Sequence, residues 1–450
     1  MCRFPVAIHH GVCIVDLTGH WVGITALVVF VVAYAFVITE EFTHLRKSKP
    51  VMLAAGIIWA VIGVYYAQTG EHELLDEAVR EYLTEFAELF LFLLAAMTYV
   101  NTMSDRLVFD ALRSKLLSRG FSYKALFWIT GVLSFFLSAL IDNLTTALVM
   151  CAVILAVGRG NPRFIAIGCV NIVVAANAGG AFSPFGDITT LMVWQAGIVR
   201  FTEFFALFVP SVVNYMVPAV FMSFAVRNEA QNVENEVVVM RRGAKRVIGL
   251  FALTVTTAVC FHNFLHLPPF LGMITGLAYL KLFGYYLRVT HDKLNAHDHG
   301  NHSAGEVVPF DSFREVARAE WDTLLFFFGV IMSVGGLSFI GYLGHLSGYM
   351  YIQLGPTTAN VLVGVMSAIV DNIPVMVAVL HMQPEMGLDQ WLLVTLTAGV
   401  GGSLLSVGSA AGVALMGQAR GKYTFFSHLR WTPFIALGYA ASIATHLWLQ

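Results

Sequence analysis

The chain contains Ser138-Ala139-Leu140-Ile141-Asp142-Asn143-Leu144 and repeats the pattern as Ser367-Ala368-Ile369-Val370-Asp371-Asn372-Ile373. Both Asp-Asn pairs are flanked by Leu, Val, Ala and Met, so we expect both at membrane depth. A carboxylate at that depth costs about 3 kcal/mol or more, which makes it a functional-site hypothesis. Finding it twice in one local sequence predicts a duplicated transport unit.

The composition is that of a membrane protein. Of 450 residues, 58% are hydrophobic and 12% are charged, against roughly 25% charged in soluble proteins. Helices and closed barrels alone satisfy their backbone in lipid, and barrel strands would alternate apolar and polar residues. The fold class is therefore an all-α polytopic membrane protein. The net charge of −2 predicts no nucleic-acid partner, and we do not interpret residues 1–19 as a signal peptide.

Charged loops give the orientation of the plain spans. Basic residues in 40–50 and 102–123 predict cytoplasmic loops, and the acidic stretch 70–82 between them predicts an outer loop. A span needs about 20 mostly apolar residues. The stretches that meet this requirement are 21–39, 51–69, 83–101, 203–226, 247–266, 269–288, 322–343 and 431–448.

Longer apolar regions are interrupted and need another interpretation. Region 124–158 has basic residues at both ends, which predicts a re-entrant hairpin with Asp142-Asn143 at its tip. Region 164–200 is broken by glycines and should cross outward. In the second half we expect a hairpin over 356–388, entering from outside, and a broken span over 391–419.

Each half therefore holds five spans and one hairpin. Five is odd, so the second half should be upside down relative to the first, and an inverted repeat places its binding site near the midplane, at broken helices. Gly179-Gly180 matches Gly401-Gly402 in the two breaks. The predicted organisation is an N-terminal segment 1–19, a first repeat 20–226, a cytoplasmic linker 227–246 and a second repeat 247–450.

Polar side chains gather at the tips and breaks. Their carboxylate, amide and hydroxyl oxygens suit a small hard cation such as Na⁺ or Li⁺. The candidate ion-binding residues are Asp142, Asn143, Thr145, Asn177, Asp187, Thr189 and Thr190 in the first half, and Ser367, Asp371, Asn372, Ser406 and Ser409 in the second.

The two halves differ at two aligned positions. Asp187 aligns with Ser409, so the first half is more acidic, and Thr145 aligns with Pro374, so the second tip should be stiffer. We therefore expect Na⁺ at Asp142, Asn143 and Asp187, with exposed backbone carbonyls, and Asp142 as the exchanging carboxylate. Asp371-Asn372 would be the supporting half. Competition of H⁺ and Na⁺ for one carboxylate gives antiport, and replacing Asp142 by Asn should abolish it.

Two further features have weaker signals. Glu88 is a candidate for a proton path or pH sensing, with a buried structural pair with Glu85 as the alternative. The His-rich loop 297–302 could bind metal or sense pH, but a solvated loop is the better interpretation. The sequence contains no P-loop or other nucleotide motif, so we expect no ATP drive, no cofactor and no enzyme activity.

Three stretches closely resemble the NhaD-type sodium/proton antiporters of the ion transporter superfamily. They span 138–148, 177–190 and 367–374, and the resemblance covers roughly 20–450. It implies Na⁺ or Li⁺ exchange for H⁺, a two-hairpin inverted-repeat fold, a homodimer, an elevator-like movement and a role in pH homeostasis at the bacterial inner membrane. Functional positions of the family fall on Asp142, Asn143, Asn177, Asp187, Thr189, Thr190, Ser367, Asp371, Asn372, Ser406 and Ser409.

Two other functions stay open at this point. An anion carrier, either a Na⁺-coupled dicarboxylate symporter or an arsenite pump, needs positive ends and hydroxyls, and three midplane carboxylates argue against it. An intramembrane aspartyl protease could use two membrane aspartates that share a proton. Its usual Gly-x-Gly-Asp motif is here Pro184-Phe185-Gly186-Asp187, and a protease needs no repeated hairpins.

Overall fold

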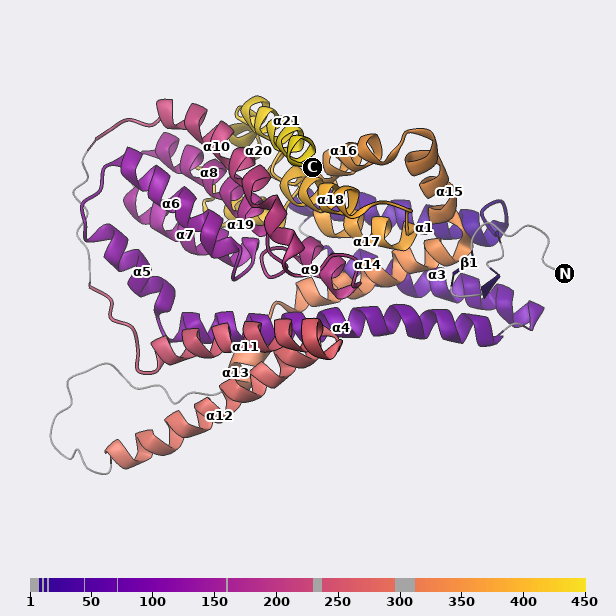
Figure 1. Cartoon of the computed structure of the whole chain (residues 1–450), viewed down its shortest axis with the longest axis horizontal. Helices are drawn as coiled ribbons and strands as arrows, with labels where there is room; N and C mark the ends of the chain where they lie inside the picture. Colours follow the sequence, from indigo (N-terminus) through magenta and orange to yellow (C-terminus); the bar gives the residue numbers. More distant parts are fainter. Residues whose placement is uncertain are drawn as a thin grey trace. The chain divides into compact units, whose positions relative to one another are not determined.

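The computed structural model describes residues 8–9, 12–13, 16–43, 45–70, 72–158, 161–229, 237–295 and 312–450. A short antiparallel pairing of β1 (Ile8–His9) with β2 (Val12–Cys13) precedes the helices, and helices make up most of the rest (Figure 1). In the described part, eight helices are long and apolar enough to cross a membrane. This confirms the predicted polytopic helical class.

The plain spans lie close to their predicted positions. The correction concerns the stretch 70–82, which we expected to be an outer loop, because α4 already begins at His72. Its Glu, Leu and Ala residues favour helix, and Asp76 pairs with Arg80 one turn later at 2.7 Å. The long helices are α1 (Trp21–Ile38), α3 (Ser48–Thr69), α4 (His72–Asp105), α8 (Pro162–Gly180), α10 (Phe208–Phe224, after the 3₁₀ turn η1, Glu203–Leu207), α11 (Ala244–Leu265), α12 (Pro269–Asn295), α14 (Trp321–Ile340) and α21 (Thr432–Leu449).

Shorter helices meet at the predicted tips and breaks. Each Asp-Asn pair lies between two half-length helices, and each glycine-rich break separates a longer helix from a short one (Figure 1). These pairs are α6 (Tyr123–Ser138) with α7 (Asn143–Val157), α8 with α9 (Ile188–Gln195), α16 (Pro356–Ser367) with α17 (Asn372–Met382), and α18 (Leu388–Gly401) with α19 (Ala410–Gln418). The connecting elements are α2 (Glu40–Thr43), α5 (Val108–Leu117), α13 (Ser312–Ala317), α15 (Tyr342–Ser347), the π turn η2 (Gly348–Gln353) and α20 (Phe425–Leu429).

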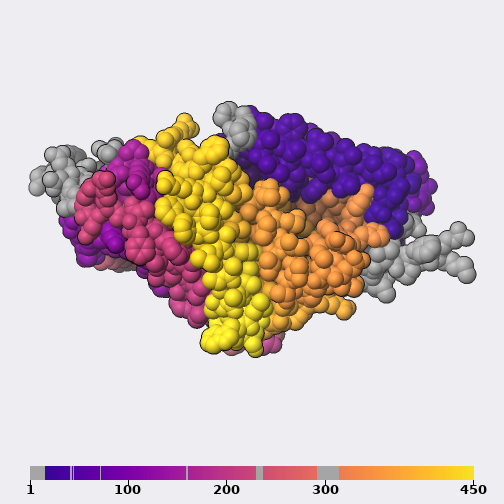
Figure 2. All heavy atoms as spheres, turned by 90° about the horizontal axis from the view of Figure 1, so that it is seen from above, coloured from indigo at the N-terminus to yellow at the C-terminus, as the bar shows by residue number. Residues whose placement is uncertain are grey.

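The chain forms two compact units that cut across the predicted repeats. The first contains Met1–Phe86, Gly120–Val233 and Asp322–Gln450, and it holds both tips and both breaks. Within it, Ile58 of α3 and Ile340 of α14 belong to one apolar cluster with α1. Figure 2 shows the indigo N-terminal residues lying beside the orange ones.

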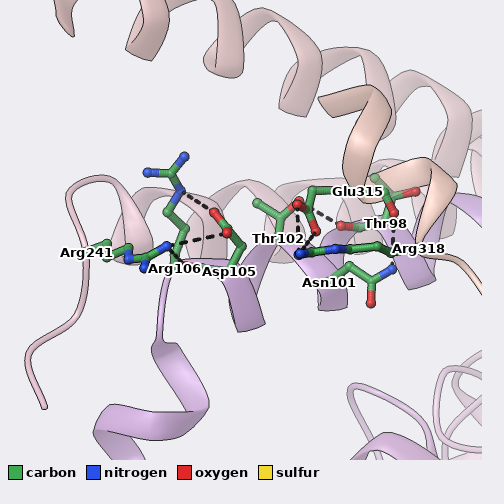
Figure 3. A network of polar contacts seen from close by, with 8 residues as sticks. All are labelled: Thr98, Asn101, Thr102, Asp105, Arg106, Arg241, Glu315 and Arg318. Carbon is green, nitrogen blue, oxygen red and sulfur yellow. Dashed lines mark hydrogen bonds and ion pairs between the residues drawn. The ribbon is translucent and has the colours of Figure 1, made fainter. Parts of the chain in front are cut away.

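The second unit contains Ala87–Arg119 and Glu234–Trp321. In this unit, Tyr99 in the later part of α4 binds both α11 and α12. Its hydroxyl donates to the carbonyl of Gly276 in α12 at 2.7 Å and accepts from the hydroxyl of Thr254 in α11 at 2.8 Å. A polar network lies along the end of α4 (Figure 3), in which Asp105 binds both Arg106 and Arg241 at 3.5 Å. The predicted His-rich loop 297–302 and linker positions 230–236 lie outside the described residues.

Glycines let the half-helices approach the broken helices closely. A Cβ on Gly179 would overlap the backbone carbonyl of Phe135, and a Cβ on Gly401 would overlap that of Gly364. Gly364 stands 229 positions after Phe135, which is also the separation of the two Asp-Asn pairs. The same backbone contact is therefore made at aligned positions of the two halves.

Replacing Gly179 by Ala should destabilise the protein by about 1–3 kcal/mol, the usual cost of forcing a methyl group into a packed site. Thermal unfolding of the detergent-purified protein measures this change. Gly417 is the matched control, because it lies in α19 with nothing within 4 Å of an added Cβ, and its replacement by Ala should leave stability unchanged or slightly raised. Equal melting temperatures for the two variants would contradict the packing argument.

Candidate functional site

The two hairpin tips differ in how their aspartates are used. Asp142 caps α7, since its Oδ1 accepts the backbone N–H of Thr145 at 2.7 Å. Its backbone has φ 110°, a conformation normally reserved for glycine. Asp371 begins α17 without such a cap, because the residue three positions on is Pro374, which has no N–H to donate. The sequence predicts that Pro374 stiffens the tip, and its missing donor has the larger consequence.

The Asp371 carboxylate instead pairs with Lys47. The Lys47 Nζ lies 2.6 Å from Asp371 Oδ2, with 18% and 10% of the two side chains exposed. The same ammonium lies 4.3 Å from the centre of the Phe326 ring, a favourable cation–π arrangement. Sequence reasoning missed this site residue, because Lys47 belongs to a basic loop that served only to orient the spans.

Asp187 is the carboxylate on which both tips converge. It is 4% exposed and caps α9, with Oδ1 accepting the backbone N–H of Thr189 at 3.2 Å. The Asn143 amide donates to Oδ2 at 3.1 Å, and the Asn372 amide donates to Oδ2 at 2.9 Å. Two side chains that are 229 positions apart thus bind one buried carboxylate.

The network continues into both broken helices. Asn143 also donates to Asn177 Oδ1 at 3.1 Å, and Asn177 in turn donates to Ser403 Oγ at 2.9 Å. The hydroxyls of Thr189 and Ser406 are buried and have no hydrogen-bond partner among the described residues. The cluster therefore combines one carboxylate with amides and spare hydroxyl oxygens, the donor set of a small hard cation.

Comparisons with known proteins place the chain in a family. A family model described as CitMHS, citrate transporter, matches residues 21–401. The Na(+)/H(+) antiporter NhaD of Alkalimonas amylolytica is 59% identical over 97% of this chain and 92% of its own length. The NhaD antiporter of Vibrio parahaemolyticus is 61% identical over 88% of this chain and 98% of its own length. Sodium/proton antiporter 1 of Arabidopsis thaliana is 33% identical over 93% of this chain and 71% of its own length. The chain belongs to the NhaD-type antiporter family.

Three serines of this NhaD-type chain hydrogen-bond the backbone at the tips and breaks. Ser138 donates to the Ala176 carbonyl at 2.6 Å, and Ser367 donates to that of Ala398 at 2.7 Å. These are aligned contacts in the two halves. Ser409 caps α19 by accepting the Gly412 N–H at 3.3 Å, just as the aligned Asp187 caps α9.

The hydroxyl of Thr190 is directed at backbone carbonyls, those of Asp187 at 2.6 Å and Ser183 at 2.8 Å. Thr145 contributes its backbone N–H to the tip rather than a described side-chain contact with the cluster. We interpret both threonines as shaping the site around the carboxylate.

Two acidic residues of α4, Glu85 and Glu88, belong to different compact units. Glu88 belongs to the second unit, and its role in proton transfer or pH sensing stays a prediction. Glu85 belongs to the first unit, where its Oε2 lies 2.9 Å from Nε2 of His381 on α17. The structure thus gives Glu85 a histidine partner on the second hairpin.

Proposed function

We propose that this chain exchanges Na⁺ for H⁺ across a membrane, with the Asp187 carboxylate as the exchanging group. The convergence of both hairpin-tip amides on that buried carboxylate carries the proposal. The names of the NhaD relatives support the same exchange. No chemical bond of a substrate is made or broken in this process, so the protein acts as a transporter and needs no cofactor.

The exchange follows from the contacts around Asp187. In the described conformation, Asn143 and Asn372 direct N–H groups at the carboxylate. Neutral donors stabilise the charge without cancelling it, so one positive charge can still be accepted. An entering Na⁺ would bind the carboxylate, and the amides would turn their oxygens towards it. A proton on the same carboxylate cancels the negative charge that attracts Na⁺, so the two ions compete for it.

Asp142 keeps a supporting role in this proposal. The sequence favours it as the exchanging group, whereas the geometry favours Asp187, because Asp142 Oδ1 is engaged by the Thr145 N–H at the start of α7. Its strained backbone, with φ 110°, holds the tip at about 1–3 kcal/mol of conformational cost. Asp142 would add negative charge at the tip and draw a cation towards the cluster.

The aligned contacts support an inverted repeat of two hairpin-and-broken-helix units. Ser138 and Ser367 make equivalent bonds, and Asp187 and Ser409 make equivalent caps. We extend this to alternating access by an elevator-like movement, with Li⁺ as a second substrate, a homodimer as the assembly and the bacterial inner membrane as the location.

The two alternatives fit the site less well. The CitMHS description names citrate, which is an anion. The Asn143 and Asn372 amides donate to the protein's own Asp187 carboxylate, so these donors are not directed at an anionic substrate. A protease would need two carboxylates sharing a proton, and Asp371 pairs with Lys47 while Asp187 binds asparagines. Uptake of labelled citrate or succinate by vesicles that show no Na⁺-driven proton flux would favour the carrier.

Replacing Asp187 by Asn should abolish Na⁺-induced dequenching of a pH-sensitive dye in everted vesicles, because the only exchanging charge at the centre of the cluster is lost. Asp76→Asn is the control for a carboxylate of the same type, since Asp76 lies exposed on α4 and pairs with Arg80. The control should behave as the wild type. A wild-type signal from Asp187→Asn would remove Asp187 from the mechanism.

Replacing Asn372 by Ala should raise the Na⁺ concentration for half-maximal exchange about tenfold, because the amide oxygen that would turn towards the bound Na⁺ is lost; tenfold corresponds to about 1.4 kcal/mol. Asn360→Ala is the matched control on the same hairpin. The Asn360 amide donates to the Gln390 backbone carbonyl at 3.0 Å and does not hydrogen-bond Asp187. We expect it to lower stability without changing that Na⁺ concentration. A similar shift in both variants would mean that the effect comes from the hairpin alone.

A further inference from the structure

The ion pair between Lys47 and Asp371 is unusual in its surroundings. Nine-tenths of the Asp371 side chain is buried, and its second oxygen, Oδ1, has no hydrogen-bond partner among the described residues. The buried hydroxyl of Tyr34, which lies close enough to Asp371 to interact electrostatically, also lacks a described partner. Asp371 Oδ1 and the Tyr34 hydroxyl are thus oxygen atoms without a described hydrogen bond, and the Lys47 ammonium is the cation beside Asp371.

One sequence difference between the two halves underlies this arrangement. Thr145 in the first half gives Asp142 an N–H to cap, and Pro374 at the aligned position gives Asp371 none. The uncapped, buried carboxylate needs a counter-charge. Lys47 supplies it from the start of α3, at 2.6 Å.

The charges of the two halves then differ. The first half carries Asp142 and Asp187, with amides and backbone N–H groups as their described donors. In the second half Ser409 replaces the break carboxylate, and the charge of Asp371 is balanced by Lys47. Among the aspartates of the aligned tips and breaks, Asp187 therefore keeps a negative charge with no described positive partner, whereas Asp371 has Lys47.

We propose that the Lys47 ammonium is a tethered cation that fills the second half-site, so that the protein binds one Na⁺ per chain. This inference rests on the proposed Na⁺/H⁺ exchange and defines its number of Na⁺ sites. Without the ammonium, Asp371, Tyr34 and the nearby carboxylate of Glu40 would offer oxygens to a second Na⁺. Glu40 and Asp322 both attract Lys47, and Ser48 donates to Asp322, which helps to hold the start of α3 in place.

Binding of radioactive ²²Na⁺ to the purified protein tests the proposal. The wild type should saturate at one Na⁺ per chain, and Lys47→Met should bind two. Lys47→Met combined with Asp371→Asn should return to one, because the second carboxylate is then neutral. Lys49→Met is the matched control, since Lys49 is an exposed lysine two positions along the same segment, and it should bind one.

If Lys47→Met folds too poorly for a binding assay, its thermal stability gives a second test. If Na⁺ replaces the ammonium, NaCl should raise the melting temperature of this variant more than that of the wild type, and choline chloride should not. One Na⁺ per chain and no extra Na⁺ stabilisation in Lys47→Met would overturn the proposal, as would two Na⁺ per chain in the wild type. Absence of Na⁺ binding from every protein, the wild type included, would instead contradict the proposed exchange.

Discussion

The Asp187 carboxylate is almost fully buried, and it is held by the amides of Asn143 and Asn372 and by one backbone N–H. Removing a charge from water costs several kcal/mol, and each hydrogen bond to a charged group returns about 1.5–3 kcal/mol. These donors are neutral, so they stabilise the buried carboxylate but leave its negative charge uncompensated. Both hairpin tips therefore meet at this single group, which is our proposed site of H⁺ and Na⁺ exchange.

Such a site works only if both tips reach the same carboxylate within about 3 Å, the length of a hydrogen bond. Glycines at the breaks, Gly179 and Gly401, allow carbonyl groups of the hairpins to approach without a Cβ between them. Ser138 and Ser367 then tie each hairpin to the neighbouring broken helix. Packing and hydrogen bonding thus set the position of the amides, and the electrostatics of the site follow from that position.

The sequence predicts where the short helices begin and end, because polar residues and glycines interrupt otherwise apolar runs at those points and polar side chains are costly in a membrane. The functional roles of the candidate site residues stay predictions. The sequence does not show which partner each aspartate has. Whether Asp142 is free or capped depends on a backbone N–H three residues later and on a positive φ. The partner of Asp371 is 324 positions away, in a segment where a lysine normally marks the cytoplasmic side. The stretch 70–82 has the charge of a loop, but its Glu, Leu and Ala residues favour helix, and this local preference decides its structure.

In the proposed mechanism, two differences between the aligned halves, at Ser409 and Pro374, contribute to making the site one-sided. Ser409 in place of an aspartate keeps the helix cap and removes the charge, because a hydroxyl accepts a backbone N–H as a carboxylate does. Pro374 keeps the half-helix, being tolerated in its first turn, and removes the cap that would have engaged Asp371. The backbone of the second half therefore stays like that of the first while its electrostatics change. Duplicated units can diverge in this way without loss of fold, because caps are satisfied locally whereas charge is balanced across the site.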